Sequence, residues 1–150
     1  MKKQNLLLSL LVKLFSGLAT NNNKGKKIKM DEQLSTFGSV LMKSVRDNTL
    51  FVLEGVIKGY MKNEVYKKMY EKIKDMSEED QSLLKDFAYR MVDLSLHNIL
   101  FMFETNKEWI ISDHENTVNI AESSDGLSGE LYTDDGWIHK FSNYKISKGL

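Results

Sequence analysis

Apolar residues recur every three or four positions through much of the first hundred residues, which is the spacing of an amphipathic helix. One stripe runs from residue 34 to residue 45, and a second runs from residue 50 to residue 60. The polar triplet Asp47-Asn48-Thr49 separates them and is typical of a helix break or a new helix start. A lysine-rich segment at 63–76 carries a third, narrower stripe, so the pattern predicts consecutive helices.

The strongest helix signal begins near residue 78. Ser77 precedes Asp80 by three positions, as in the capping box found at helix starts. Beyond it, large apolar side chains fall on one side of the helix, and we expect this side to face the core. These side chains belong to Leu84, Phe87, Met91, Leu94 and Phe101. The pattern predicts three to five helices in all, and the longest covers about residues 78–104.

The period changes after Lys107, where short β-branched runs replace the helical spacing. "WIISD" and "TVNIA" flank the connection "HEN", and "GELYT" and "WIHKFS" flank "DDG". Each arrangement is typical of a β-hairpin, and the second requires a positive φ at Gly136. Its register turns Leu131 and Phe141 toward the core. The sequence therefore predicts an α+β fold, in which an N-terminal helical region precedes a small antiparallel β-sheet of two hairpins.

The first 30 residues differ in composition from the rest. They carry seven Lys and neither Asp nor Glu, although the chain of 150 residues is neutral as a whole. Leucines fill most of the opening "MKKQNLLLSLLVKLFSGLAT", and Ser9, Lys13 and Ser16 share one side of it, which predicts a basic amphipathic helix. We interpret residues 1–29 as this helix and a linker, and residues 30–150 as a single α+β domain.

Several alternatives remain for residues 1–29. They include a cleaved signal peptide, a membrane anchor, a helix docked on the domain, and a segment that precedes a true start at Met30. The expected location is the cytoplasm. A peripheral membrane protein, held on an anionic surface by residues 2–29, is the second hypothesis for function, because basic amphipathic helices bind such surfaces.

Catalytic and cofactor motifs are scarce. There is no Cys, which excludes disulfides, thiolate metal sites and a cysteine nucleophile. Ser128 lies in "GLSGE", but a strand is expected after it where a nucleophile elbow needs a helix, so it is interpreted as a turn residue. His97, His114 and His139 lie on different predicted elements and give the weak alternative of a metal-dependent hydrolase. We predict no catalytic residue, no cofactor and no metal.

Charge patterns separate two classes of partner. The acids Glu64, Glu71 and Asp75 are interleaved with the lysine cluster between residues 67 and 74, so we expect no specific nucleic-acid binding. Between Glu104 and Asp135, in contrast, nine acids accompany a single Lys, and Trp and Tyr side chains lie among or beside them. Aromatic side chains anchor protein interfaces and opposite charges steer the encounter, so this region is suited to binding a basic protein.

The leading hypothesis is therefore a small non-enzymatic bacterial protein, of the immunity or inhibitor type, that binds a basic partner protein through an acidic C-terminal surface. The expected binding residues are Asp125, Glu130, Tyr132, Asp134, Asp135 and Trp137.

Overall fold

The computed structural model describes residues 26–115 and 118–145. It begins with a helical rod of three directly connected segments, which are residues 26–41, the π-helix η1 (Met42–Asp47) and α2 (Asn48–Ile57). The backbone stays helical through Asp47 (φ −64°, ψ −39°), so a break at residues 47–49 is wrong, although α2 does start at Asn48, without a side-chain cap. Arg46 and Asp47 are both buried within η1, and Asp47 accepts hydrogen bonds from the C-terminal segment instead of capping a helix.

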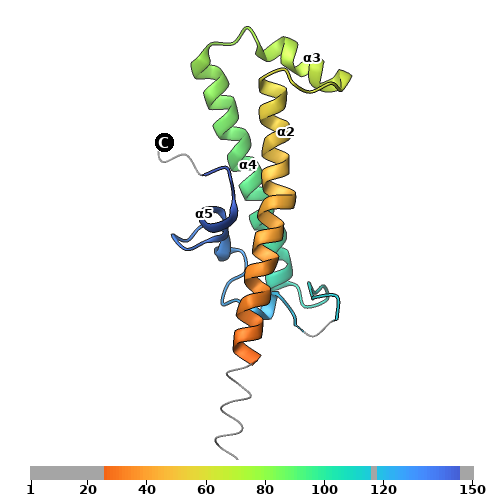
Figure 1. The fold of residues 1–150 in the computed structure, drawn as a ribbon, viewed down its shortest axis with the longest axis vertical. Helices are drawn as coiled ribbons and strands as arrows, with labels where there is room; N and C mark the ends of the chain where they lie inside the picture. Colours follow the sequence, from red (N-terminus) through yellow and green to blue (C-terminus); the bar gives the residue numbers. More distant parts are fainter. Residues whose placement is uncertain (1–25, 116–117, 146–150) are drawn as a thin grey trace, which may run out of the picture.

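Two further helices complete the scaffold. After the rod, α3 (Glu64–Ile73) lies across its far end, and α4 (Glu78–Thr105) returns alongside it (Figure 1). Three short helical elements follow in the C-terminal region, beside the two long helices (Figure 1). They are η2 (Ala121–Ser123), η3 (Gly129–Leu131) and α5 (Trp137–Phe141).

The start of α4 confirms the capping-box prediction. The Ser77 side chain accepts a hydrogen bond from the Asp80 backbone N–H (3.1 Å), and its hydroxyl donates to the Asp80 carboxylate (2.7 Å). The first turn also carries the acids Glu78, Glu79 and Asp80, whose negative charges interact favourably with the positive N-terminal end of the helix dipole. The end of α4 at Thr105 lies one residue beyond the predicted boundary.

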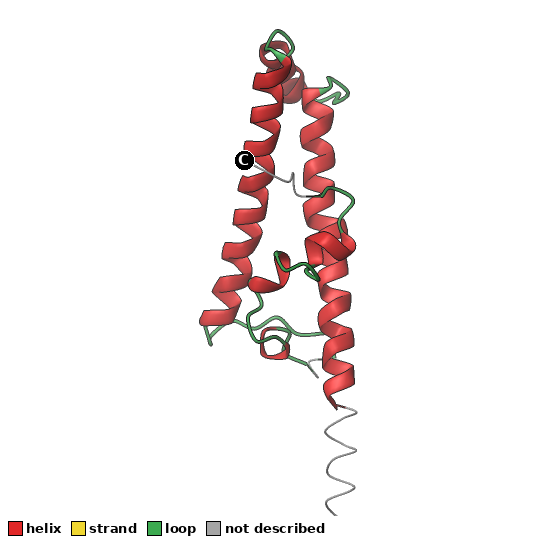
Figure 2. Cartoon of the chain, turned by 90° about the vertical axis from the view of Figure 1, so that its left-hand side faces the viewer, coloured by secondary structure: helices red, strands yellow, loops and turns green. Residues whose placement is uncertain are grey.

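The predicted α+β fold is wrong, because the described residues contain no β-strand and no sheet (Figure 2). The first expected hairpin is reduced to one isolated antiparallel bridge between Ser112 and Asn119. In place of the second hairpin, Gly129–Leu131 forms the 3-10 helix η3 and Trp137–Phe141 forms α5. The region after α4 is therefore irregular chain with short helical turns.

The burial pattern of α5 explains this outcome. Trp137 and Ile138 are adjacent yet both buried, Phe141 is half-buried, and His139 is exposed. Side chains at positions i, i+1 and i+4 share a helix face, whereas adjacent residues of a strand point to opposite faces. A helical turn therefore places Trp137, Ile138 and Phe141 on one side, which the predicted alternation could not do.

Gly136 lies at the start of α5 for a different reason from the one predicted. Its φ is −73°, so the expected positive φ is wrong. A turn does form, and the Gly136 N–H donates to the Thr133 carbonyl over 2.7 Å. A Cβ at this position would stand only 2.8 Å from the carbonyl oxygen of Glu130. Glycine is therefore needed here for space.

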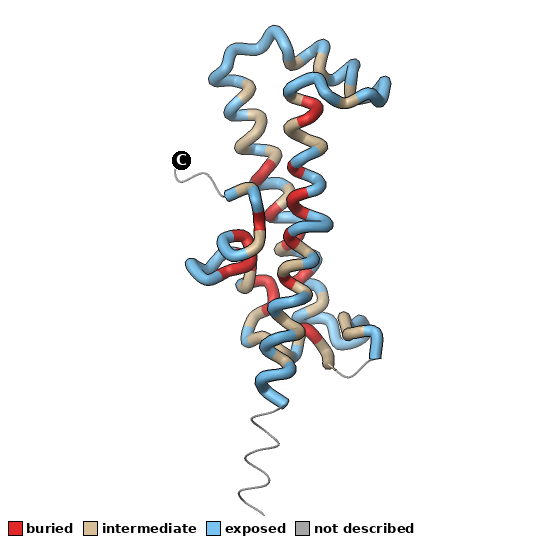
Figure 3. The backbone as a smooth tube through the Cα atoms, viewed as in Figure 1, coloured by how far each residue is buried: buried red, intermediate tan, exposed pale blue. Residues whose placement is uncertain are grey.

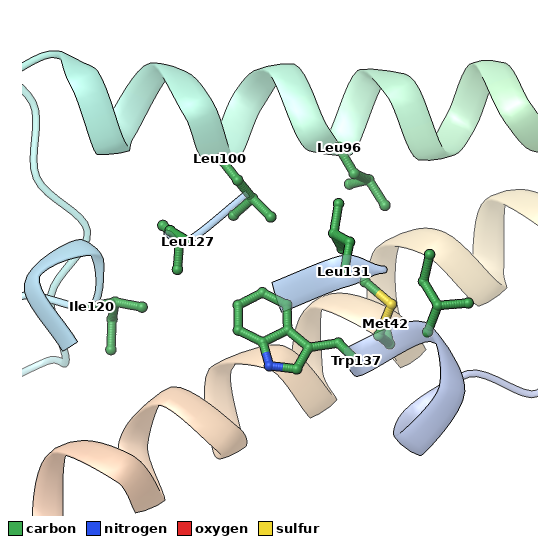
Figure 4. Packing of buried hydrophobic residues seen from close by; sticks show 8 residues of the cluster. Met42, Leu96, Leu100, Ile120, Leu127, Leu131 and Trp137 are labelled. Atoms are coloured by element: carbon green, nitrogen blue, oxygen red, sulfur yellow. The ribbon is translucent and has the colours of Figure 1, made fainter. Parts of the chain in front are cut away.

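The core is a cluster of buried apolar side chains between the rod, α4 and the C-terminal region (Figure 4). Trp137 packs edge-on against Phe37, with ring centroids 5.7 Å apart, and its indole occupies the space beside Gly38. Leu131 is buried and Phe141 packs on the cluster, which confirms that both face the core. Buried positions become rare toward α3 (Figure 3). The cluster consists of Met42, Leu96, Leu100, Ile120, Leu127, Leu131, Trp137 and Ile138.

The predicted core side of α4 is wrong. The buried residues of this helix are Tyr89, Asp93, Leu96 and Leu100. The side chains expected in the core lie on the opposite side, where four of them are between 40% and 58% exposed. The reason is that the rod and the C-terminal region offer partners to the other side of α4, including a buried arginine for Asp93. The four exposed residues are Phe87, Met91, Leu94 and Phe101.

The predictions for residues 1–25 lie outside the described residues. Residues 26–29, assigned to the N-terminal helix and linker, are helical and continue directly into residues 30–41. Among residues 26–115 and 118–145, none of the helices combines the length and the apolar character that a membrane span requires.

Candidate functional site

An acidic hollow of about 560 Å³ lies between the 26–41 helix and the loop that joins η2 to η3. Asp31 comes from the helix, and Asp125 and Glu130 come from the C-terminal side of the hollow. Three carboxylates thus face one ammonium group, that of Lys27. The lining residues are Lys27, Asp31, Leu34, Ser123, Ser124, Asp125, Gly126, Glu130 and Thr133.

Local hydrogen bonds give the hollow its shape. The Ser124 hydroxyl donates to the Glu130 carboxylate over 2.7 Å and accepts from the Gly126 N–H over 3.1 Å. The Ser123 hydroxyl donates to the Asn119 carbonyl over 2.9 Å. These contacts fix the loop and hold one Glu130 oxygen, while Asp125 remains exposed. Carboxylates arranged in this way accept hydrogen bonds from ammonium or guanidinium groups.

The predicted binding residues divide into three groups. Asp125 and Glu130 meet on the acidic hollow, and Asp134 and Asp135 are exposed and directly follow Thr133, which also lines it. Tyr132 is 47% exposed and its hydroxyl donates to the Asp93 carbonyl (3.1 Å), while burial raises the pKa of its phenol. Trp137 is only 3% exposed and belongs to the core. A binding role for the acids stays a prediction, and Asp31 is an addition to them.

The three histidines do not form a metal site in the part of the chain that the structure describes. His97 lies on α4, and its ring is near those of Phe101 and Tyr132, with centroid distances of 6.2 and 5.8 Å. His114 is exposed in the loop after α4, and His139 is exposed on α5. No group of three potential ligands among the described residues has an arrangement that would hold a metal ion.

A buried polar network surrounds Arg46 and was not predicted from the sequence. The Arg46 guanidinium is completely buried and binds both oxygens of Asp93, with Nε–Oδ1 and Nη2–Oδ2 distances of 2.6 and 3.0 Å. Its Nη1 donates to the Ser142 hydroxyl and to the Tyr144 carbonyl, each over 2.6 Å. One pattern in the sequence points to it: Met42, Arg46 and Leu50 follow one another at four-residue intervals, and all three are fully buried.

The same network holds the C-terminal segment. The Ser142 hydroxyl donates to Asp47 over 2.5 Å, and the Asn143 N–H donates to the other Asp47 oxygen over 2.8 Å. Ser142 and Asp47 are both buried, and each is engaged in this network. These contacts connect η1, α4 and residues 142–144. We therefore interpret the Arg46 network as a structural anchor.

A second polar network connects α2 with α4. Glu54 of α2 accepts hydrogen bonds from Tyr89 (2.7 Å) and Lys58 (3.1 Å), and it pairs with Lys85 (2.7 Å). The hydrogen bond from Lys85, and then that from Tyr89, lower the pKa of Glu54 to about 2. Burial, followed by the hydrogen bond to Glu54, raises the pKa of Tyr89 well above its usual range. The network stabilises the packing of α2 against α4 near the end of this helix pair that adjoins α3.

Ser128, the residue of the "GLSGE" motif, also has a structural contact. Its hydroxyl and its backbone N–H both donate to one Glu104 oxygen, over 3.0 and 3.1 Å. The serine therefore ties the loop before η3 to the end of α4.

Searches against protein-family models, curated proteins and solved structures find no match to this chain.

Proposed function

We propose that this protein is a non-enzymatic binding protein of the immunity or inhibitor type, which docks a basic segment of a partner protein on the acidic hollow. The observation that carries the proposal is the convergence of Asp31, Asp125 and Glu130 on one hollow. Asp31 lies more than ninety positions before Asp125, so folding is what brings these carboxylates together.

The size and charge of the acidic hollow favour a cationic side chain. A volume of about 560 Å³ is ample for the end of an arginine or lysine side chain. Guanidinium groups form paired, charge-assisted hydrogen bonds with carboxylates, which gives such contacts both direction and strength. A basic side chain is thus the occupant that the lining accommodates best.

The surroundings of the hollow favour a protein over a small cation. Asp134, Asp135 and Glu122 are exposed on the same stretch of chain, beyond the hollow itself. Acids spread over such an area attract a basic surface from a distance and increase the rate of encounter, and salt weakens this attraction. A partner with several basic residues would use both the hollow and its surroundings.

A binding measurement with an oligo-arginine peptide tests this proposal. We expect the Asp31→Asn/Asp125→Asn variant to lose affinity by on the order of tenfold, since charge-assisted hydrogen bonds contribute about 1.5–3 kcal/mol and exposure reduces that value. Asp75→Asn/Glu79→Gln is the matched control, because it removes two exposed acids remote from the hollow. Fluorescence anisotropy at low and high salt supplies the affinities. Equal losses in both double variants would show that only overall charge matters and would contradict the proposal.

A further inference from the structure

The outer side of α4 carries large apolar side chains that no described part of the chain covers. It lies opposite to the buried Tyr89, Leu96 and Leu100. In Figure 2, α4 forms one edge of the molecule, and the rod and the C-terminal elements lie to its other side. The exposed residues are Leu83 (59%), Phe87 (58%), Met91 (40%), Leu94 (46%), Phe101 (49%) and Met102 (44%).

Four of these side chains, Phe87, Met91, Leu94 and Phe101, follow a heptad pattern. Positions alternate at spacings of three and four, which is the a and d pattern that places one continuous stripe against a partner helix. We call this stripe the α4 seam. Its a positions hold Leu84, Met91 and Asn98, and its d positions hold Phe87, Leu94 and Phe101. The residues that α4 buries in its own core fall outside this set, so the helix has two separate apolar faces.

The flanks of the α4 seam are almost free of charge. From Leu83 to Met102, the neighbouring e and g positions contain one formally charged residue, Arg90. The acids Asp86 and Asp93 lie at other heptad positions, and Asp93 is buried in the Arg46 network. Depletion of charge is the compositional mark of the centre of a protein interface.

From this pattern we infer that the α4 seam binds a second copy of the chain, with the two α4 helices side by side and parallel. In a parallel pair, each a residue meets its own counterpart, so Asn98 faces Asn98 of the partner and the two amides hydrogen-bond to each other. In an antiparallel pair, a positions meet d positions. Asn98 would then face Phe87, Leu94 or Phe101, and its amide would be buried without a partner.

The apolar area of the seam and its flanks suits this occupant. A large side chain offers roughly 200 Å² when fully accessible, so the four exposed apolar side chains of the seam and the two on its flanks, Leu83 and Met102, leave on the order of 600 Å² uncovered at about half exposure each. This value is at the upper limit of the apolar patches found on monomers, about 300–600 Å². A specific interface buries about 800 Å² on each partner, and the polar residues beside the seam supply the difference.

Sedimentation equilibrium on the full chain tests the inference. Two variants distinguish the effect of the seam from that of any exposed apolar side chain on α4. From low to high micromolar concentrations, we expect the mass to approach twice 17.3 kDa. Leu94→Glu should restore the monomer mass, because it places two carboxylates in the centre of the interface. Ile99→Glu is the control. Ile99 is 51% exposed on the same helix but lies outside the seam, so this variant should still dimerise.

Disulfide cross-linking tests the parallel orientation independently. The chain has no Cys, so Asn98→Cys creates a single thiol at the a position. We expect this variant to form a covalent dimer on oxidation. Ser82→Cys, at an exposed position away from the seam, should not, and neither should Asn98→Cys combined with Leu94→Glu.

Three outcomes would overturn the inference. A monomer mass at every concentration would show that the seam does not bind a second copy of the chain. A dimer that survives Leu94→Glu would place the interface elsewhere. A dimer without cross-linking through Asn98→Cys would exclude the parallel arrangement. Because the acidic hollow takes no part in these measurements, peptide binding can fail or succeed independently of them.

Discussion

The two faces of α4 are both rich in apolar residues, yet among residues 26–115 and 118–145 only the inner one is covered. The inner face includes Tyr89 and Asp93, whose polar groups bond to Glu54 and Arg46 of the helical rod. Asn98 is the polar member of the outer seam. The comparison shows that apolar content alone does not decide which face becomes interior. The face whose polar groups find partners within the chain is buried, and the face without them remains for a second molecule.

Removing the Asp93 carboxylate should have the largest effect, because it breaks the contact that selects the inner face. Asp93→Ala removes the two close carboxylate contacts of the buried Arg46 guanidinium and leaves it with Asp47 at 4.0 Å and two neutral hydrogen-bond acceptors, so we expect a loss of about 3–5 kcal/mol in the free energy of unfolding. Urea denaturation measures it. The control is Arg46→Met/Asp93→Leu, which should be more stable than Asp93→Ala because no guanidinium is left buried opposite the missing carboxylate. A loss below about 1 kcal/mol in Asp93→Ala would show that the pair does not fix the helix.

Two neighbouring residues provide a matched test of the two faces. Leu100 is 1% exposed in the core and Phe101 is 49% exposed on the seam. Leu100→Ala should destabilise the protein by about 2–5 kcal/mol, whereas Phe101→Ala should cost less than about 1 kcal/mol in the folded monomer. Urea denaturation at low protein concentration measures both values without a contribution from association. Equal losses would mean that the seam is covered within a single chain.

A smaller, pH-dependent effect on stability should come from Glu54, which binds Tyr89 on the inner face of α4. The pKa of Glu54 is lowered to about 2 in the folded protein from 4.5, chiefly by Lys85 and then by Tyr89. This carboxylate therefore stabilises the fold fully above pH 4.5, and its contribution disappears as pH falls toward 2. We expect Glu54→Gln to lose about 1 kcal/mol at neutral pH.

Thermal unfolding between pH 2 and pH 6 measures this effect. The difference in melting temperature between the wild type and Glu54→Gln should shrink as pH falls from 4.5 to 2. A difference that stays constant through that window would contradict the assigned role of Lys85 and Tyr89.

Local signals predicted some elements of this fold, and tertiary contacts overrode others. The cap at Ser77 was predictable because it depends on residues within one turn. The seam of α4 was recognised as a regular apolar stripe but was wrongly assigned to the core, because the true inner face could be identified only by knowing that Arg46 and Asp93 meet across 47 positions. The β-branched runs after Lys107 favoured strands. In the second expected hairpin, Trp137 and Ile138 are adjacent and both buried, which a helical turn allows and a strand does not.

The candidate site was predictable only in part. The acidity of the C-terminal half identified Asp125 and Glu130 as binding residues, and both line the acidic hollow. Asp31 was missed, because its contribution depends on a loop that packs on a distant helix. Trp137 was expected at the binding surface as an anchor, but the space beside Gly38 receives its indole in the core.

The most direct test of the central claim, that the outer face of α4 binds a second copy, is the dependence of stability on protein concentration. Association of folded chains raises the unfolding midpoint as concentration increases. For the full wild-type chain, we predict a midpoint in urea that rises steadily with protein concentration. For Leu94→Glu, we predict a midpoint that stays constant. A wild-type midpoint that does not change with concentration would contradict the claim.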